Sequence, residues 1–163
     1  MNDVDIKNVI EENKKLIEEF PFLLPHNRWT DKVAKDYDYR YTELDAMPNG
    51  WRKAFGIDLC KELKESLIRV NYLEKYRISQ IKEKYGMLRW YDFGAPEEFI
   101  RIILPKYVKR SKLTCIKCGT PATKISSSWI SPYCDDCAKY FTGEDFADIN
   151  EYYAEVEDEC NNE

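Results

Sequence analysis

The sequence predicts an α+β protein, with helices packed on a small antiparallel β-hairpin, a C-terminal zinc-ribbon or treble-clef-like module and an acidic C-terminal helix. Three observations support this. Apolar residues recur at helical spacing in several segments, an aromatic stretch surrounds Gly86 as in a hairpin, and two Cys-x-x-Cys pairs are separated by fifteen residues. We expect a core domain at 1–112, a zinc module at 113–141 and an acidic helical tail at 142–163.

The N-terminal segment 4–20 has the pattern of an amphipathic helix that ends before Pro21. An ordered loop should follow, with Trp29 fixing it. The stretch 36–41 alternates tyrosine with charged residues, which predicts a short strand. Pro48-Asn49-Gly50 then predicts a turn.

Two further helices are expected in the sequence, one before the hairpin and one after it. After the turn, apolar residues recur every three or four positions from Trp51 to about Tyr72. Ala95-Pro96 begins the next helix, since proline is favoured in a first turn. Pro105 should kink or end that helix.

The segment 77–93 is the most aromatic part of the chain, and its periodicity also fits a helix. Gly86 at its midpoint favours a hairpin. Alternation along two strands then places one set of polar and aromatic side chains on a single face: Gln80, Lys82, Lys84, Arg89 and Tyr91. Such a face suits a phosphate or a carboxylate ligand. A solvated outer face is the alternative.

Four cysteines have the spacing of a zinc site: Cys115, Cys118, Cys134 and Cys137. Each pair holds one side of a tetrahedral ion, and Gly119 permits the tight turn after the first pair. Four thiolates close the coordination shell, so we expect one structural zinc per chain. A small hairpin should connect the pairs. A helix opening at Cys134 would make the module treble-clef-like, and strands alone would make it a ribbon.

Charge is distributed unevenly along the chain. The net charge is −5, yet 142–163 carries nine acidic and no basic residues, which leaves net +4 elsewhere. The stretch 99–134 has no acidic residue. Its cations, Lys109 and Arg110 among them, make 101–124 a candidate nucleic-acid surface, with Trp129 and Tyr133 near enough to stack a base. The tail is expected to form a helix from 144 to 159. Its candidate partner-binding residues are Glu144, Asp145, Asp148, Glu151 and Tyr152.

The sequence also indicates in which cellular compartment the protein is expected. No run of eighteen apolar residues is present, and the first five residues lack the features of a signal peptide. Paired cysteines without such a signal favour a reducing cytoplasm. Cys60 lies in an apolar helical pattern and is expected to be buried.

Three stretches together resemble a family of small uncharacterised proteins encoded by bacteriophages and prophages, especially in gut Firmicutes. They are Pro48-x-Gly50-Trp51, then Gln80-Ile-Lys-Glu-Lys84-Tyr85-Gly86-x-Leu88-Arg89-Trp90-Tyr91, and Cys115-x-x-Cys118-Gly119 with its partner pair. The likeness covers roughly residues 20–140. It implies a phage-type protein with a zinc module in the host cytoplasm, and it implies no activity.

The residue inventory favours binding over catalysis. A closed thiolate shell leaves no metal-bound water, and no nucleophile or phosphate-loop motif is present. We expect a protein that binds and inhibits a host macromolecule, such as an anti-CRISPR, with the acidic tail imitating nucleic acid on a nucleic-acid-processing defence complex. The alternative is an accessory protein that binds nucleic acid through the basic stretch 101–124.

Overall fold

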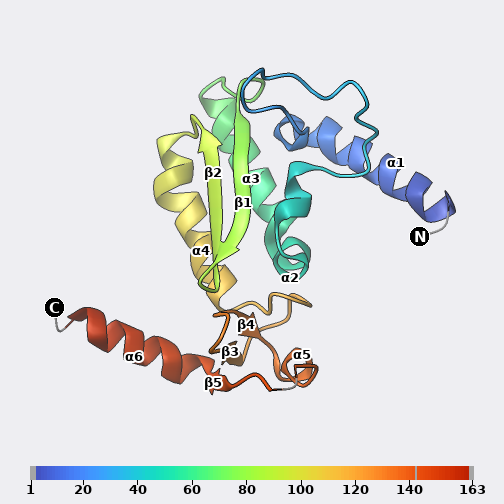
Figure 1. Cartoon of the computed structure of the whole chain (residues 1–163). Coiled ribbons are helices and arrows are strands. Elements are labelled where there is room, and N and C mark those ends of the chain that lie inside the picture. Colours follow the sequence, from blue (N-terminus) through green and yellow to red (C-terminus); the bar gives the residue numbers. More distant parts are fainter. Residues whose placement is uncertain (1–2, 142, 162–163) are drawn as a thin grey trace.

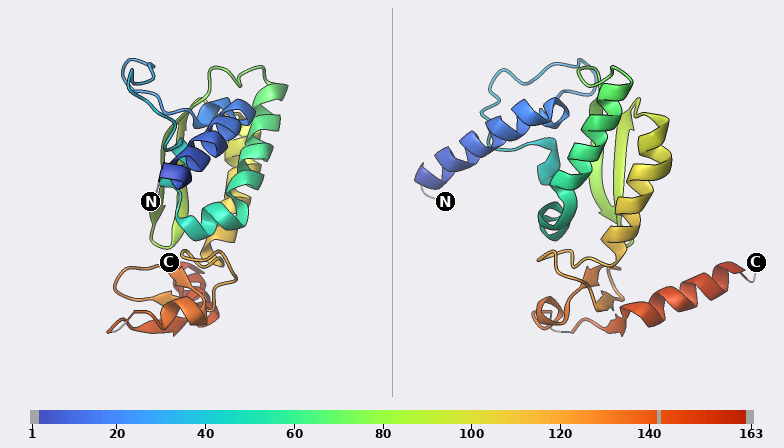
Figure 2. Two further views of the ribbon diagram at one scale, coloured as in Figure 1. Left: turned by 90° about the vertical axis from the view of Figure 1, so that its right-hand side faces the viewer. Right: turned by 180° about the vertical axis from the view of Figure 1, so that it is seen from behind.

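The computed structural model describes residues 3–141 and 143–161, and it is an α+β fold with two small antiparallel sheets. The first sheet is the hairpin of β1 (Arg77–Lys84) and β2 (Met87–Phe93). Behind it in Figure 1 lie α3 (Ile57–Arg69) and α4 (Leu104–Lys112), which stand in front when the molecule is seen from behind in Figure 2. The helix α1 (Asp3–Glu19) runs outward on the β1 side.

The hairpin predicted around Gly86 is confirmed. Its two-residue turn has positive φ at both Tyr85 (54°) and Gly86 (72°), the geometry that matches the twist of paired strands. The inward side chains Ile78, Ile81, Leu88 and Trp90 are buried against the helices. The opposite face of the hairpin therefore remains for solvent or a ligand.

Short helical segments complete the core. Turns of 3-10 helix occupy Pro21–Leu23 and Glu43–Ala46, and α2 (Asn49–Trp51) leads through a π-helical turn at Arg52–Gly56 into α3. A second π-helical turn, Phe99–Ile103, precedes α4. Large side chains from these segments share one core with the hairpin, including Phe22, Trp51, Phe55, Phe99 and Tyr107, each at most 1% exposed.

The second sheet belongs to the cysteine module below the hairpin turn (Figure 1). Its strand order is β4-β3-β5, with β3 (Lys124–Ser126) between β4 (Pro132–Tyr133) and β5 (Phe146–Asp148). A short helix, α5 (Asp135–Ala138), follows β4. The terminal helix α6 (Ile149–Asn161) continues from β5.

Backbone contacts at α2 join the module to the core. The indole N–H of Trp51 donates to the carbonyl oxygen of Thr114 at 2.9 Å, and the N–H of Gly50 donates to that of Ile116 at 2.9 Å. Because both donors lie at the start of the α2–α3 helical run, the metal-site loop is fixed directly on the core.

Three sequence predictions are wrong in detail. The stretch 36–41 is not a strand, since Tyr39 has a φ of +64° and the ring of Tyr37 packs 4.9 Å from that of Tyr39. Asn49 and Gly50 begin α2 instead of forming a turn. Of the two outcomes predicted for Pro105, an end of the helix is wrong, because the π-helical turn Phe99–Ile103 continues directly into α4 through this residue.

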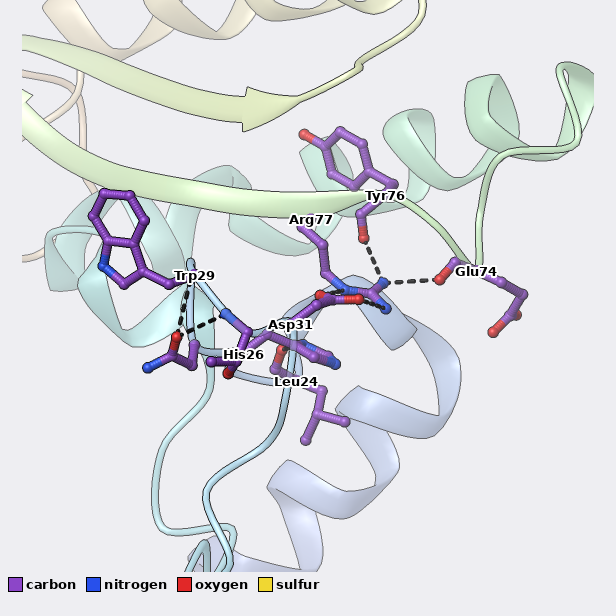
Figure 3. Close-up of polar contacts among 9 residues, drawn as sticks. Leu24, His26, Trp29, Asp31, Glu74, Tyr76 and Arg77 are labelled. Carbon is purple, nitrogen blue, oxygen red and sulfur yellow. Dashed lines mark hydrogen bonds and ion pairs between the residues drawn. The ribbon is translucent and has the colours of Figure 1, made fainter.

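The loop around Trp29 is ordered, but the tryptophan does not fix it. Its side chain is 93% exposed. Other contacts hold the loop: the Asn27 carboxamide oxygen accepts from the N–H of Trp29 at 2.9 Å. Asp31 also pairs with Arg77 at 2.8 Å (Figure 3). The single histidine, His26, is bound locally through Nδ1 at 2.7 Å from the Leu24 carbonyl.

Candidate metal centre and binding face

The four predicted cysteines meet in one cluster. The Sγ atoms of Cys115, Cys118, Cys134 and Cys137 all lie within 4.8 Å of one another. A tetrahedral ion with metal–sulfur bonds of about 2.3 Å requires sulfur atoms about 3.8 Å apart, and Cys118 and Cys134 are separated by 3.6 Å. All four are free thiols. The cluster can therefore hold a metal ion, and its donor set and spacing fit zinc.

Two local turns build this cluster. In the first, the N–H of Gly119 donates to the carbonyl of Cys115 at 3.0 Å, and Gly119 takes a φ of +84° that glycine adopts cheaply. In the second, Cys134 caps α5, and its Sγ accepts from the N–H of Cys137. A helical turn carrying the second pair is the feature expected of a treble-clef-like module.

The surroundings of the thiols differ. The hydroxyl of Thr120 lies 3.0 Å from Cys118 Sγ and lowers the pKa of that thiol to about 6. Burial raises the pKa of Cys115, whose side chain is inaccessible. Because thiolates are the metal ligands, Thr120 favours the binding form of Cys118. Four thiolates fill a tetrahedral shell and leave no position for a substrate.

The predicted polar face of the hairpin also forms, and we call its residues the outer face: Gln80, Lys82, Lys84, Arg89 and Tyr91. Directly opposed residues share a side of the sheet, and the register pairs Gln80 with Tyr91 and Lys82 with Arg89. The ammonium of Lys82 lies 5.4 Å from the centre of the Tyr91 ring. Within the described part of the chain, the three cations of this face form no ion pair.

At the turn end of the outer face, a groove of about 510 Å³ separates the hairpin from the cysteine module. Its lining comes from two segments: Lys82, Glu83, Lys84 and Tyr85 from the hairpin, and Ser127, Ser128, Trp129 and Ile130 from the loop between β3 and β4. Trp129 is 73% exposed and Tyr85 63% exposed. The outer face therefore continues into an aromatic groove.

Three cations of the basic stretch 101–124 already have acidic partners. Arg101 pairs with Glu97 and Lys106 with Glu62. Arg110 contacts the carbonyl of Ala54 at 2.8 Å and Asp58 at 3.7 Å.

Lys109 lies elsewhere on α4, in a groove that it shares with Lys112, Leu113 and Tyr153. Three of the seven cations in 101–124 thus pair with carboxylates. Two of these acids, Glu62 and Asp58, come from α3, so the stretch alone does not reveal the pairing.

The acidic candidates have mainly local partners. Glu144 accepts from the N–H of Ser128 at 2.9 Å and from its hydroxyl, and the carbonyl of Asp145 accepts from Ser127. Asp148 caps α6 through the N–H groups of Asn150 and Glu151.

Tyr152 packs against Tyr153 with ring centres 5.2 Å apart, and Glu151 is exposed. The predicted helix 144–159 is shorter at its start, because 146–148 form β5. The side chains after Glu155 lie outside the described part of the chain.

Two groove residues were not singled out from the sequence. Tyr85 is exposed because the hairpin turn presents it, and Glu83 bridges to the indole N–H of Trp129 at 3.0 Å, 46 positions away. Only the hairpin register and the placement of the module reveal this pair. Tyr133, the other expected stacking residue, packs instead on Phe141 and Phe146 at 5.0 and 5.7 Å.

None of the described helices is long and apolar enough to cross a lipid bilayer. Comparison with known proteins found no family model, no curated protein and no solved structure that matches this sequence.

Proposed function

We propose that this protein is a zinc-stabilised binding protein that recognises nucleic acid through the outer face. The observation that carries the proposal is a set of three cations on one sheet face that form no ion pair with any described residue: Lys82, Lys84 and Arg89. Cations of this kind release counterions from a phosphate backbone. Tyr91, 45% exposed beside Lys82, adds an aromatic surface of the kind that accepts a base.

The outer face suits this role better than the stretch 101–124. A phosphate approaching Arg110 or Lys106 competes with carboxylates already in place. A phosphate approaching Arg89 meets no such competing carboxylate, because no ion pair involves Arg89 among the residues that the structure describes. The proposal therefore places recognition on the hairpin and gives the cysteine module a supporting role.

In this proposal the zinc ion is structural. Bound by the four cysteines, it fixes the loop after Thr114 on Trp51 and the β3–β4 loop beside the hairpin turn. The ion would neutralise the charge of the four thiolates and cross-link the two cysteine pairs rigidly. Binding, and not catalysis, is the activity that we assign to the chain.

Charge reversal on the outer face tests the proposal. The double variant Lys82→Glu/Arg89→Glu should bind a mixed-sequence oligonucleotide at least about 10-fold more weakly at low salt, because two phosphate contacts become repulsive. The slope of log K against log salt concentration should become shallower by about 1.4 units for a single strand, because two of three phosphate contacts are lost. Fluorescence anisotropy across a salt series measures both quantities.

The matched control is Lys7→Glu/Lys15→Glu on α1, which changes the net charge equally at exposed positions away from the hairpin. The control should bind like the wild type. Equal losses in the two double variants would show a nonspecific charge effect and contradict a site on the outer face.

A second candidate function rests on α6, which extends away from the rest of the chain in Figures 1 and 2. Glu151 and Glu155 are exposed on it. An acidic helix of this kind fits a basic groove on a host nucleic-acid-processing protein, where it would imitate phosphate charge and block a defence complex.

Neutralisation tests this second candidate, because Glu151→Gln/Glu155→Gln removes two charges and leaves β5 in place. Affinity capture from bacterial lysate with nuclease should then lose any protein partner held by charge mimicry. A nuclease-resistant partner that the variant still retains would contradict the mimicry.

A further inference from the structure

The groove at the hairpin turn is built around an exposed tryptophan whose edge is fixed. The carboxylate of Glu83 accepts from the indole N–H of Trp129 at 3.0 Å with one oxygen. Its other oxygen accepts from the N–H of Gly86 at 2.7 Å. One side chain thus ties the module's loop to the hairpin turn, and the ring remains 73% exposed.

The loop behind Trp129 is also held in place. The hydroxyl of Ser126 donates to the carbonyl of Trp129 and accepts from the N–H of Ser131. Glu144 binds both the N–H and the hydroxyl of Ser128. A ligand that stacks on this ring therefore meets a preorganised surface and orders little of the protein on binding.

The hairpin side of the groove supplies a second ring and positive charge. Tyr85 is 63% exposed, and the ammonium of Lys84 lies 5.3 Å from the centre of its ring. Lys82 completes this side of the groove. The groove volume of about 510 Å³ is in the range of small-ligand sites.

We propose that this groove holds an unpaired base of single-stranded nucleic acid, stacked on Trp129, with neighbouring phosphates on Lys82 and Lys84. The inference rests on the proposed function and narrows it to single strands. A base inside a duplex has both faces covered by its neighbours, so an exposed indole gains little from it. A base in a single strand offers a free face, and stacking of this kind tolerates any sequence.

The cations of the groove favour an anionic occupant over a purely apolar one. A hydrophobic peptide side chain would stack on Trp129 equally well but would leave Lys82 and Lys84 without a counter-charge. In a nucleic-acid single strand, a base can stack on the indole ring while the neighbouring phosphates contact the ammonium groups.

Intrinsic fluorescence provides the direct test. Trp51 is fully buried and Trp90 is 6% exposed, so in a Trp29→Phe variant the exposed indole is Trp129. Saturation with a single-stranded 12-mer should quench that variant's emission strongly. The matched Trp129→Phe variant, which keeps Trp29, should show much weaker quenching. An unquenched Trp29→Phe protein with the oligonucleotide bound would overturn the inference.

A binding measurement separates this inference from the proposed function. Trp129→Leu keeps an apolar side chain without an aromatic face, and it should weaken single-strand binding at least about 5-fold while changing duplex binding little. If Trp129→Leu binds as wild type while Lys82→Glu/Arg89→Glu does not, the groove inference fails and the outer face stands. If the wild type binds neither strand form, both fail.

Discussion

Replacement of Cys115 by serine is expected to abolish metal binding and to unfold the C-terminal module. Cys115 is fully buried in the cluster, and serine offers no thiolate at that position. Structural zinc contributes on the order of 10 kcal/mol to the folding of small domains. The variant should contain no zinc by elemental analysis, whereas we expect one ion per chain in the wild type.

The module is also expected to lose its thermal transition in this variant, while the core keeps part of its helical signal. Cys60→Ala is the matched control, because Cys60 is equally buried but lies outside the cluster, in the core. That protein should retain its zinc at some cost in stability. A wild-type protein that is stable and free of metal would contradict the structural role of the ion.

Substitution of Gly50 by alanine is expected to destabilise the protein by at least about 3 kcal/mol. A Cβ atom at this position would lie 2.1 Å from the carbonyl oxygen of Cys115 and 2.7 Å from the carbonyl carbon of Ile116. Both are backbone atoms of the metal-site loop, so neither a rotamer change nor a small side-chain shift relieves the overlap. Urea unfolding followed by circular dichroism measures the loss.

Gly143→Ala provides the comparison for this variant. Gly143 has a φ of +80°, but nothing lies within 4 Å of an added Cβ. Its cost should therefore be limited to backbone strain, about 1 kcal/mol. If Gly50→Ala unfolds at the same urea concentration as the wild type, that result would contradict the close packing of Gly50 in α2 against the metal-site loop.

Local patterns in the sequence predicted the elements that depend on local chemistry. Gly86 resolved an ambiguous periodicity in favour of the hairpin, because Tyr85 and Gly86 both take positive φ there. The cysteine spacing predicted the cluster, since two tight turns bring each pair together regardless of the remaining fold. The burial of Cys60 followed from its helical apolar pattern in the same way.

The failures arise where distant segments meet. Alternation at 36–41 predicts a strand, but none of the strands in the described part of the chain pairs with it, and the tyrosines pack on one another instead. Within the basic stretch 101–124, Lys106 and Arg110 pair with Glu62 and Asp58, which reach them from α3.

The acidic tail is a further case in which contacts between distant segments could not be predicted from the sequence. Part of the segment 142–163 is β5, which pairs with β3 and so belongs to the sheet of the cysteine module. Glu144 accepts a hydrogen bond from the N–H of Ser128 in the β3–β4 loop. Asp148 caps α6. The resemblance to phage-encoded proteins, with the host-defence role it suggests, stays a prediction.

The most direct measurement of the central claim is an equilibrium titration of the zinc-containing protein with a labelled single-stranded oligonucleotide at increasing salt. With Lys82, Lys84 and Arg89 as the phosphate contacts, log K should fall linearly with log salt concentration with a slope of about −2. The absence of binding at low salt, or binding that salt does not weaken, would contradict nucleic-acid recognition by the outer face.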